Sequence, residues 1–114
     1  MLKIKRGDAL PLVTNLFIGK HRADPDVDAI HIVEFAIPGL EEKEWNSEGT
    51  GTVEYDSETK QFRVPLTQEE TFSFECGDEL VVDIRVQFDD GTVYGVEKPP
   101  RFRVIPAVSD EVLS

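Results

Sequence analysis

Apolar residues occupy every second position along much of the chain between Gln61 and Val104. The alternation runs through Phe62–Leu66, Leu80–Phe88 and Phe102–Val104. A period of two is typical of strands that bury one face and leave the other in water. Because almost no reactive side chains lie between these positions, the pattern predicts the wall of a β-sandwich rather than an active site.

The first half of the chain predicts four further strands. Leu2–Ile4 and Leu10–Ile18 are two short alternating segments separated by a glycine-containing bend. Gly19–Asp28 is polar and contains a proline, so we expect a loop there. Ile30–Ile37 is apolar on both faces, as a central strand is. Thr52–Tyr55 is predicted to form a hairpin with the strand that starts at Gln61, through a connection of about five residues.

Turn and helix signals fall between these strands. Leu40–Ser47 is rich in helix-forming residues and predicts one or two helical turns. Thr67–Glu70 matches a capping box at the start of a short helical turn, and Asp89–Gly91 is a strong hairpin signal. Two prolines precede Phe102–Ile105, which is therefore expected to be an edge strand or to follow a bulge. In all, about seven to eight short strands predict an all-β, immunoglobulin-like antiparallel β-sandwich.

Composition agrees with a single folded domain over residues 1–114, with a short polar tail from about residue 107. The chain has 114 residues, of which 39% are hydrophobic, and seven Phe, two Tyr and one Trp can supply one core. Its formal net charge of −11 repels nucleic acid and anionic lipid over most of the surface. We therefore expect neither nucleic acid nor membrane as a partner.

Cys76 is the only cysteine, so the chain cannot form an internal disulfide or a cysteine-based metal site by itself. The apolar stretch Ala9–Val13 is too short for the core of a signal peptide. No run approaches the roughly 20 apolar residues that span a bilayer. We expect a soluble protein that is made in the cytoplasm.

Asp24, Asp26 and Asp28 alternate along the predicted loop and are candidate oxygen ligands for calcium. An EF-hand that began at Asp24 would need glycine at Ala29 and a bidentate glutamate at Phe35, so that motif fails. The competing interpretation, a solvated acidic loop, is preferred. We therefore predict no metal site and no cofactor.

Catalytic chemistry has few candidate residues. His21 falls in a predicted loop, His31 in a predicted central strand and Cys76 in a predicted turn, so no nucleophile is placed beside an oriented base. The tripeptide Arg6-Gly7-Asp8 resembles an adhesion-receptor ligand, but the same residues form a good turn between two strands. We predict no catalytic residues and no enzymatic activity.

Trp45 is the one candidate for an interface or ligand contact. An aromatic side chain with a polar handle suits sugar stacking and protein interfaces alike. It is equally able to close one end of the sandwich, and packing is the preferred interpretation.

Three segments of the chain resemble the N-terminal β-sandwich domain of phage baseplate upper proteins and of small related prophage tail proteins. They are KIKRGDALPL, VEYDSETKQFRVPLTQEET and DELVVDIRVQFDDGTVYGVEKPPRFRVIPAVSDE. The stretch DPDVDAIHI departs from the pattern, because a short Asp-Leu-Thr turn is expected before the third strand. The resemblance implies a virion structural module with no cofactor and no catalysis.

The leading hypothesis is therefore a non-enzymatic tail or baseplate protein that acts as an adaptor or assembly module. Its implied partners are other phage tail or baseplate subunits, with a homo-oligomer as a further option, and its implied location is the virion. The alternative is a module that binds host-surface carbohydrate through Trp45 and the Asp24–Asp28 loop, with or without calcium.

Overall fold

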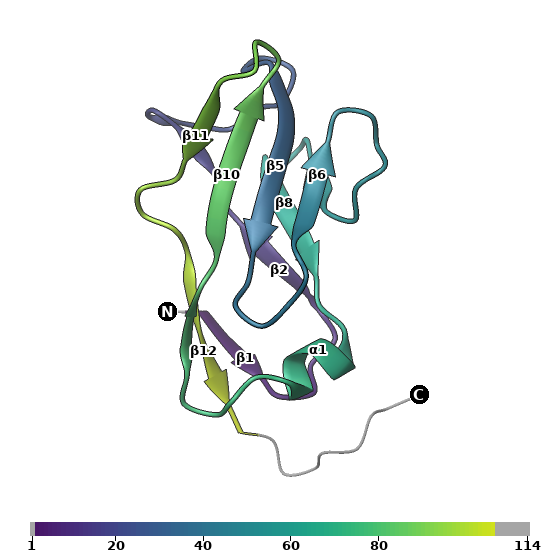
Figure 1. Cartoon of the computed structure of the whole chain (residues 1–114), viewed down its shortest axis with the longest axis vertical. Helices are drawn as coiled ribbons and strands as arrows, with labels where there is room; N and C mark the ends of the chain where they lie inside the picture. The colour runs from purple at the N-terminus through teal and green to yellow at the C-terminus, as the bar shows by residue number, and fades with distance from the viewer. Residues whose placement is uncertain (1, 107–114) are drawn as a thin grey trace.

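The computed structural model describes residues 2–106, and most of them lie in strands or in the turns that join them (Figure 1). The predicted all-β class is confirmed. In chain order the elements are β1 (Leu2–Lys5), β2 (Pro11–Thr14), β3 (Phe17–Ile18), β4 (His21–Arg22), β5 (Ile30–Ala36), β6 (Lys43–Asn46), β7 (Glu54–Asp56), β8 (Gln61–Pro65), α1 (Gln68–Phe72), β9 (Glu79–Val81), β10 (Asp83–Phe88), β11 (Val93–Gly95) and β12 (Arg101–Ile105).

Two of the sheets contact each other through aromatic side chains of the core. One has the order β11-β10-β5-β6 and the other the order β2-β8-β7. Phe62 of β8 joins them, because its ring centroid lies 5.9 Å from that of Phe35 in β5 and 6.0 Å from that of Trp45 in β6. A third sheet, β1-β12-β9, continues the first one, since only Val82 separates β9 from β10.

The alternating positions predicted from the sequence form the core. Phe62 and Val64 of β8, Ile84 and Val86 of β10, and Phe102 of β12 are all at most 1% exposed. β5 is a central strand, as predicted, with β10 on one side and β6 on the other.

The predicted turn chemistry is also present. Thr67 and Glu70 form a reciprocal capping box at the start of α1. Gly91 has φ +89 in the hairpin between β10 and β11, a backbone conformation that glycine adopts without strain.

The helical turns predicted for Leu40–Ser47 are wrong, because β6 forms there and pairs with β5. The residues are good helix formers, but a helix would not place Trp45 on Phe62 while β5 gains a hydrogen-bonded neighbour. Tertiary pairing therefore overrides the local helix propensity.

Three strand predictions need correction. The segment Leu10–Ile18 is not one strand, since β2 ends at Thr14 and β3 begins at Phe17. The predicted loop Gly19–Asp28 contains β4, which pairs with β3 in a short hairpin. The closing strand β12 is not an edge strand, because β1 pairs with it in parallel on one side and β9 pairs with it on the other.

Breaks within strands explain why the structure has more segments than predicted. Leu80–Phe88 divides at Val82 into β9 and β10, and β3 and β4 form an extra short pair. The predicted polar tail from about residue 107 lies outside the described residues. Within residues 2–106, no helix has the length and apolar run that crossing a membrane requires.

Candidate interaction site

A groove of about 340 Å³ lies between the β3 turn and the strands β10 and β11. Its floor includes Leu16 and Ile84, which are at most 2% exposed. Its walls include Phe17 and Tyr94, which are 51% and 41% exposed. Large aromatic side chains in contact with water are unfavourable on a free surface and are enriched where proteins bind one another.

Beside this groove, β11 is the edge of its sheet, and its register fixes which backbone groups point outward. Val96 donates its N–H to the carbonyl of Ile84 at 3.0 Å, so that position is a hydrogen-bonded pair of the antiparallel ladder. Bonded and non-bonded pairs alternate along such a ladder. Val93 and Gly95 therefore direct their N–H and C=O groups away from β10. This edge has no proline, and it offers both donors and acceptors to an added strand.

The edge of β2 is partly blocked by a proline. Leu66 donates its N–H to the carbonyl of Leu10 at 3.3 Å, so the neighbouring pair, Pro11 and Pro65, is not hydrogen-bonded. The nitrogen of Pro11 therefore lies on the outer side of β2, where it has no hydrogen to donate. Prolines are a common protection of sheet edges against unwanted pairing.

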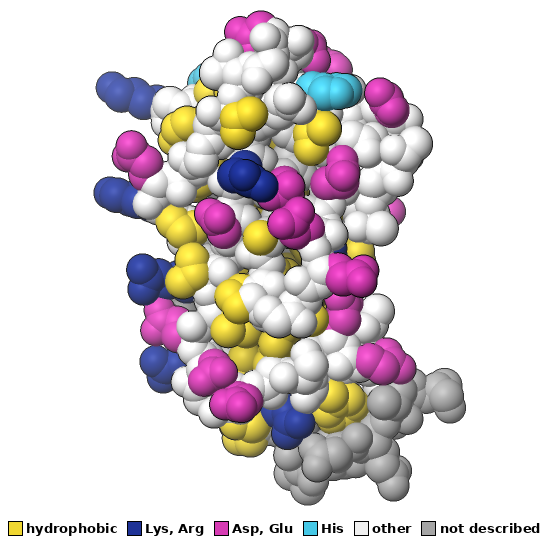
Figure 2. Space-filling view, viewed as in Figure 1, with side chains coloured by type: hydrophobic (Ala, Val, Ile, Leu, Met, Phe, Trp, Pro, Cys, Tyr) yellow, Lys and Arg dark blue, Asp and Glu magenta, His cyan; other side chains and the backbone are white. Residues whose placement is uncertain are grey.

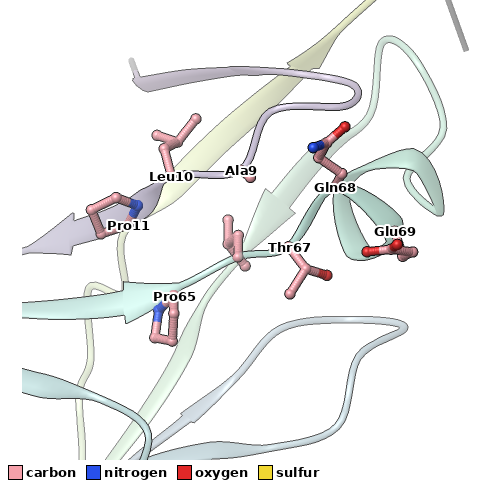
Figure 3. A pocket seen from close by; sticks show the side chains of 8 residues that line it. Ala9, Leu10, Pro11, Pro65, Thr67, Gln68 and Glu69 are labelled. Atoms are coloured by element: carbon pink, nitrogen blue, oxygen red, sulfur yellow. The ribbon is translucent and has the colours of Figure 1, made fainter. Parts of the chain in front are cut away.

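An open hollow of about 490 Å³ lies at this end of β2 (Figure 3). Leu10 and Pro11 line one side, Pro65 of β8 lies opposite, and Gln68 and Glu69 come from the first turn of α1. The hollow is wide and largely apolar, and few polar groups converge on it. Its polar lining residues, Thr67, Gln68 and Glu69, are consecutive and all lie at the start of α1.

The acidic loop satisfies its own backbone. Asp28 accepts a hydrogen bond from the N–H of Asp24 at 2.8 Å, and its other oxygen lies 2.8 Å from Nε2 of His21. Asp24 accepts from the N–H of Asp26 at 3.1 Å and lies 3.7 Å from Nζ of Lys60. Within residues 2–106, no group of three or more His, Cys, Asp or Glu side chains is arranged to hold a metal ion. The side chains of Asp24 and Asp28 thus hold the loop together.

Tyr55 in β7 lies next to this loop and donates its hydroxyl to the carbonyl of Ala23 at 3.0 Å. Burial raises the pKa of Tyr55, and the negative charges of Asp24, Asp28 and then Asp26 raise it further. The acidic loop is thus electrostatically coupled to the β7 side of the molecule.

Trp45 is half-buried and has two environments. Its ring contacts that of Phe62 in a T-shaped arrangement, and the side chain also lines a hollow of about 280 Å³ together with Asp26 and Asp89. The sequence suggested that Trp45 and the acidic loop act together, and the structure places Asp26 of that loop in the same hollow. Asp24 and Asp28 do not line it.

The Arg6-Gly7-Asp8 turn is bound to α1. Arg6 donates to the carbonyl of Phe72 at 2.9 Å, and the N–H of Gly7 donates to Oγ1 of Thr71 at 2.9 Å. Asp8 accepts from the N–H of Lys5, three residues back, at 3.0 Å. These contacts give the tripeptide a structural role as a turn.

The structure leaves His21, His31 and Cys76 on separate elements. His21 is in β4 beside Asp28, and Cys76 is exposed in the turn after α1. His31 of β5 has Nδ1 2.9 Å from Oγ of Ser47, a neighbour that the sequence analysis did not identify. Within residues 2–106, no carboxylate is found in a hydrogen bond to His31 that would orient its ring as a triad requires.

Comparison of the chain with family models, with curated proteins and with solved structures finds no match. The sequence analysis missed Phe17, Tyr94 and Gly95, because the groove joins segments far apart in the chain. The local signal was present, since Tyr94 closely follows the predicted hairpin turn Asp89–Gly91.

Proposed function

We propose that the protein is a non-enzymatic adaptor or assembly module of a phage or prophage tail or baseplate, and that it binds an extended segment of another subunit along β11. The observation that carries this proposal is the open edge of β11 beside the groove lined by Phe17 and Tyr94. The sequence resemblance to baseplate and prophage tail domains supports the virion setting.

Strand addition explains how such an edge binds. The N–H and C=O groups of Val93 and Gly95 would pair with the backbone of the added segment, and the groove would receive alternate apolar side chains. Gly95 has no side chain to obstruct the edge, and among residues 2–106 no non-neighbouring atom lies within 4 Å of the position that its Cβ would take. Affinity then comes from the backbone bonds, and specificity comes from the aromatic walls.

The immunoglobulin-like sandwich is part of the proposal. The sheet order β11-β10-β5-β6 faces β2-β8-β7, β1 runs parallel to β12, and a short helix joins β8 to β9. This order is compatible with two antiparallel sheets that exchange strands in an immunoglobulin-like topology. Such sandwiches serve many unrelated binding functions, so the argument for function rests on β11 rather than on the fold.

The test is a density gradient of particles from an induced host culture that expresses the tagged protein. We expect the protein to co-sediment with tails or whole particles, and Gly95→Pro to lose at least ~10-fold of that signal. Proline at position 95 removes an outward N–H without removing a bond to β10. Gly95→Ala is the matched control, because it adds a methyl group in open space and keeps the N–H.

A protein that remains in soluble fractions while particles are plainly present contradicts the virion role. Co-sedimentation that is equal for Gly95→Pro and Gly95→Ala contradicts the use of β11. Far-UV circular dichroism of both variants verifies that the sheet has formed.

The hollow beside Trp45 favours the alternative, a host-surface carbohydrate module. An aromatic side chain flanked by Asp26 and Asp89 combines a stacking surface with hydrogen-bond acceptors for sugar hydroxyls. Retention on purified host cell walls, with and without chelator, tests it. Loss of retention in Asp26→Asn and Asp89→Asn would support carbohydrate binding. If only the chelator abolishes retention, the binding requires calcium.

A further inference from the structure

The outer face of the β1-β12-β9 sheet carries a cluster of cations. Lys3 and Lys5 of β1 are exposed on either side of the buried Ile4, and Arg101 and Arg103 of β12 are exposed on either side of the buried Phe102. Successive side chains of a strand alternate between faces, so all four cations lie on the face opposite the core. We call this cluster the basic face.

The basic face is only partly neutralised. Lys3 lies directly beside Arg103 in the β1–β12 register, where like charges repel, and Glu79 of β9 lies beside Arg103 on the other side. Arg101 pairs with Glu79 at 3.3 Å, and the carboxylate of Asp8 accepts the backbone N–H of Lys5. Within residues 2–106, no ion pair is found for Lys3, Lys5 or Arg103. A negatively charged partner would relieve this repulsion.

The opposite charge is concentrated on the far side of the molecule. Residues 41–58 contain seven acidic residues and one basic residue, Lys43. Lys43 turns inward to Glu70, with 2.8 Å between Nζ and Oε1. Glu44 and Glu54 are exposed on β6 and β7, and these strands are joined by a hydrogen bond from Val53 N–H to the carbonyl of Glu44. We call residues 41–58 the acidic band.

The space-filling view shows an uneven distribution of charge. Lys and Arg side chains lie mainly along the left rim, on the side of β11 and β12 in Figure 1, with acidic side chains among them, whereas the right rim, on the side of β6, carries mainly acidic side chains (Figure 2). When surfaces of opposite charge lie on opposite sides of one molecule, the positive surface of one copy can contact the negative surface of a second copy that has the same orientation.

We propose that the basic face binds the acidic band of a second copy of this chain. Such a contact is heterologous, so it continues from copy to copy and produces a closed ring or an open filament. Without the four cations of the basic face, the remaining formal charge is 8 − 23 = −15. This negative charge repels nucleic acid, but it attracts the positively charged basic face of another copy.

This contact extends the proposed role in assembly but uses a different surface from β11. Charge changes on β1, β6 and β12 leave the groove at Phe17 and Tyr94 unaltered. Failure of one proposal therefore leaves the other standing.

The experiment measures self-association of the full chain by sedimentation velocity from ~50 mM to ~500 mM NaCl, since screening of exposed charges strengthens over this range. We expect association at low salt that weakens at least ~10-fold at high salt. Two variants, Lys3→Glu/Arg103→Glu and Glu42→Lys/Glu44→Lys, should each be monomeric. An equimolar mixture of the two should associate again, because each supplies the surface that the other lacks.

Lys20→Glu/Lys60→Glu is the matched control, since it makes the same change in net charge outside the basic face and the acidic band. Its self-association should be closer to that of the unaltered chain than the self-association of Lys3→Glu/Arg103→Glu is. A chain that is monomeric at low salt overturns the proposal, and so does association that neither charge-reversed variant reduces. Binding of a short DNA duplex to the basic face while the protein stays monomeric would also overturn it.

Discussion

At the scale of single residues, Thr71 fixes the turn between β1 and β2 to the helix α1. Its side chain is fully buried, and its hydroxyl lies 2.9 Å from the carbonyl oxygen of Asp8 and accepts the N–H of Gly7. Buried polar groups are rarely left without such partners, because an unpaired one costs free energy. The turn itself was predictable from its glycine and aspartate. Its partner was not, because Thr71 is more than 60 positions away and its side chain carries no local signal.

Gly7→Ala should destabilise the protein by about 3 kcal/mol, from backbone strain and a steric clash together. Gly7 has φ +89, and a Cβ there would lie 2.7 Å from Cζ of Phe72. Gly91→Ala separates the two causes, since Gly91 has the same φ but nothing within 4 Å of its Cβ position. It should cost about 1 kcal/mol. Urea denaturation of both variants checks this, and equal losses would contradict a clash at Gly7.

At the scale of elements, β6 shows where local sequence is misleading. Its pattern has a period of two, with Lys43 and Trp45 turned inward and Glu44 exposed. In the sequence, a lysine at an inward position looks like a surface residue, so the alternation of inward and outward residues in β6 is not recognisable. The helix propensity of these residues is then the stronger local signal. The reason for the inward lysine lies in another element, because Nζ of Lys43 binds the carbonyl of Pro65 and the carboxylate of Glu70.

This contact makes the stability of the α1 end depend on pH. Burial raises the pKa of Glu70, but the hydrogen bonds from Lys43 and from the N–H of Thr67 outweigh it, so the pKa is held below its ordinary value of 4.5. A carboxyl whose pKa is lower in the folded state stabilises the fold above its unfolded pKa. That stability is lost as the pH falls below 4.5 and through the folded pKa. Glu70→Gln should therefore lower the stability at pH 7 and weaken its dependence on acid.

Urea midpoints of the unaltered chain and Glu70→Gln between about pH 3 and pH 7 measure the effect. Glu69→Gln is the control, because Glu69 is exposed in the same helical turn and makes no ion pair with Lys43 within residues 2–106. It should retain the acid dependence of the unaltered chain. A Glu70→Gln curve parallel to that of the unaltered chain would contradict the role of the Lys43–Glu70 pair.

At the scale of the whole molecule, alternating residues predicted the core well and the candidate site poorly. In strands such as β8, β10 and β12, the buried face can be identified from the local sequence, because every second residue is buried. The groove requires residues 15–19 to meet residues 94–100, and the basic face requires the two ends of the described chain to pair in parallel. Neither arrangement leaves a local pattern, because contacts between distant segments are set by sheet order.

The same sheet order predicts that the described residues unfold as one unit. Phe62 contacts both Trp45 and Phe35 across the two sheets, and β9 and β10 connect the third sheet to the first. Disruption of one sheet therefore exposes the core of the others, and unfolding should be two-state. Trp45 fluorescence, which reports the contact between sheets, and far-UV circular dichroism, which reports the strands, should give the same urea midpoint and slope. A fluorescence transition at lower urea would show instead that β6 separates before the rest, and the acidic band would then be a mobile surface rather than a rigid one.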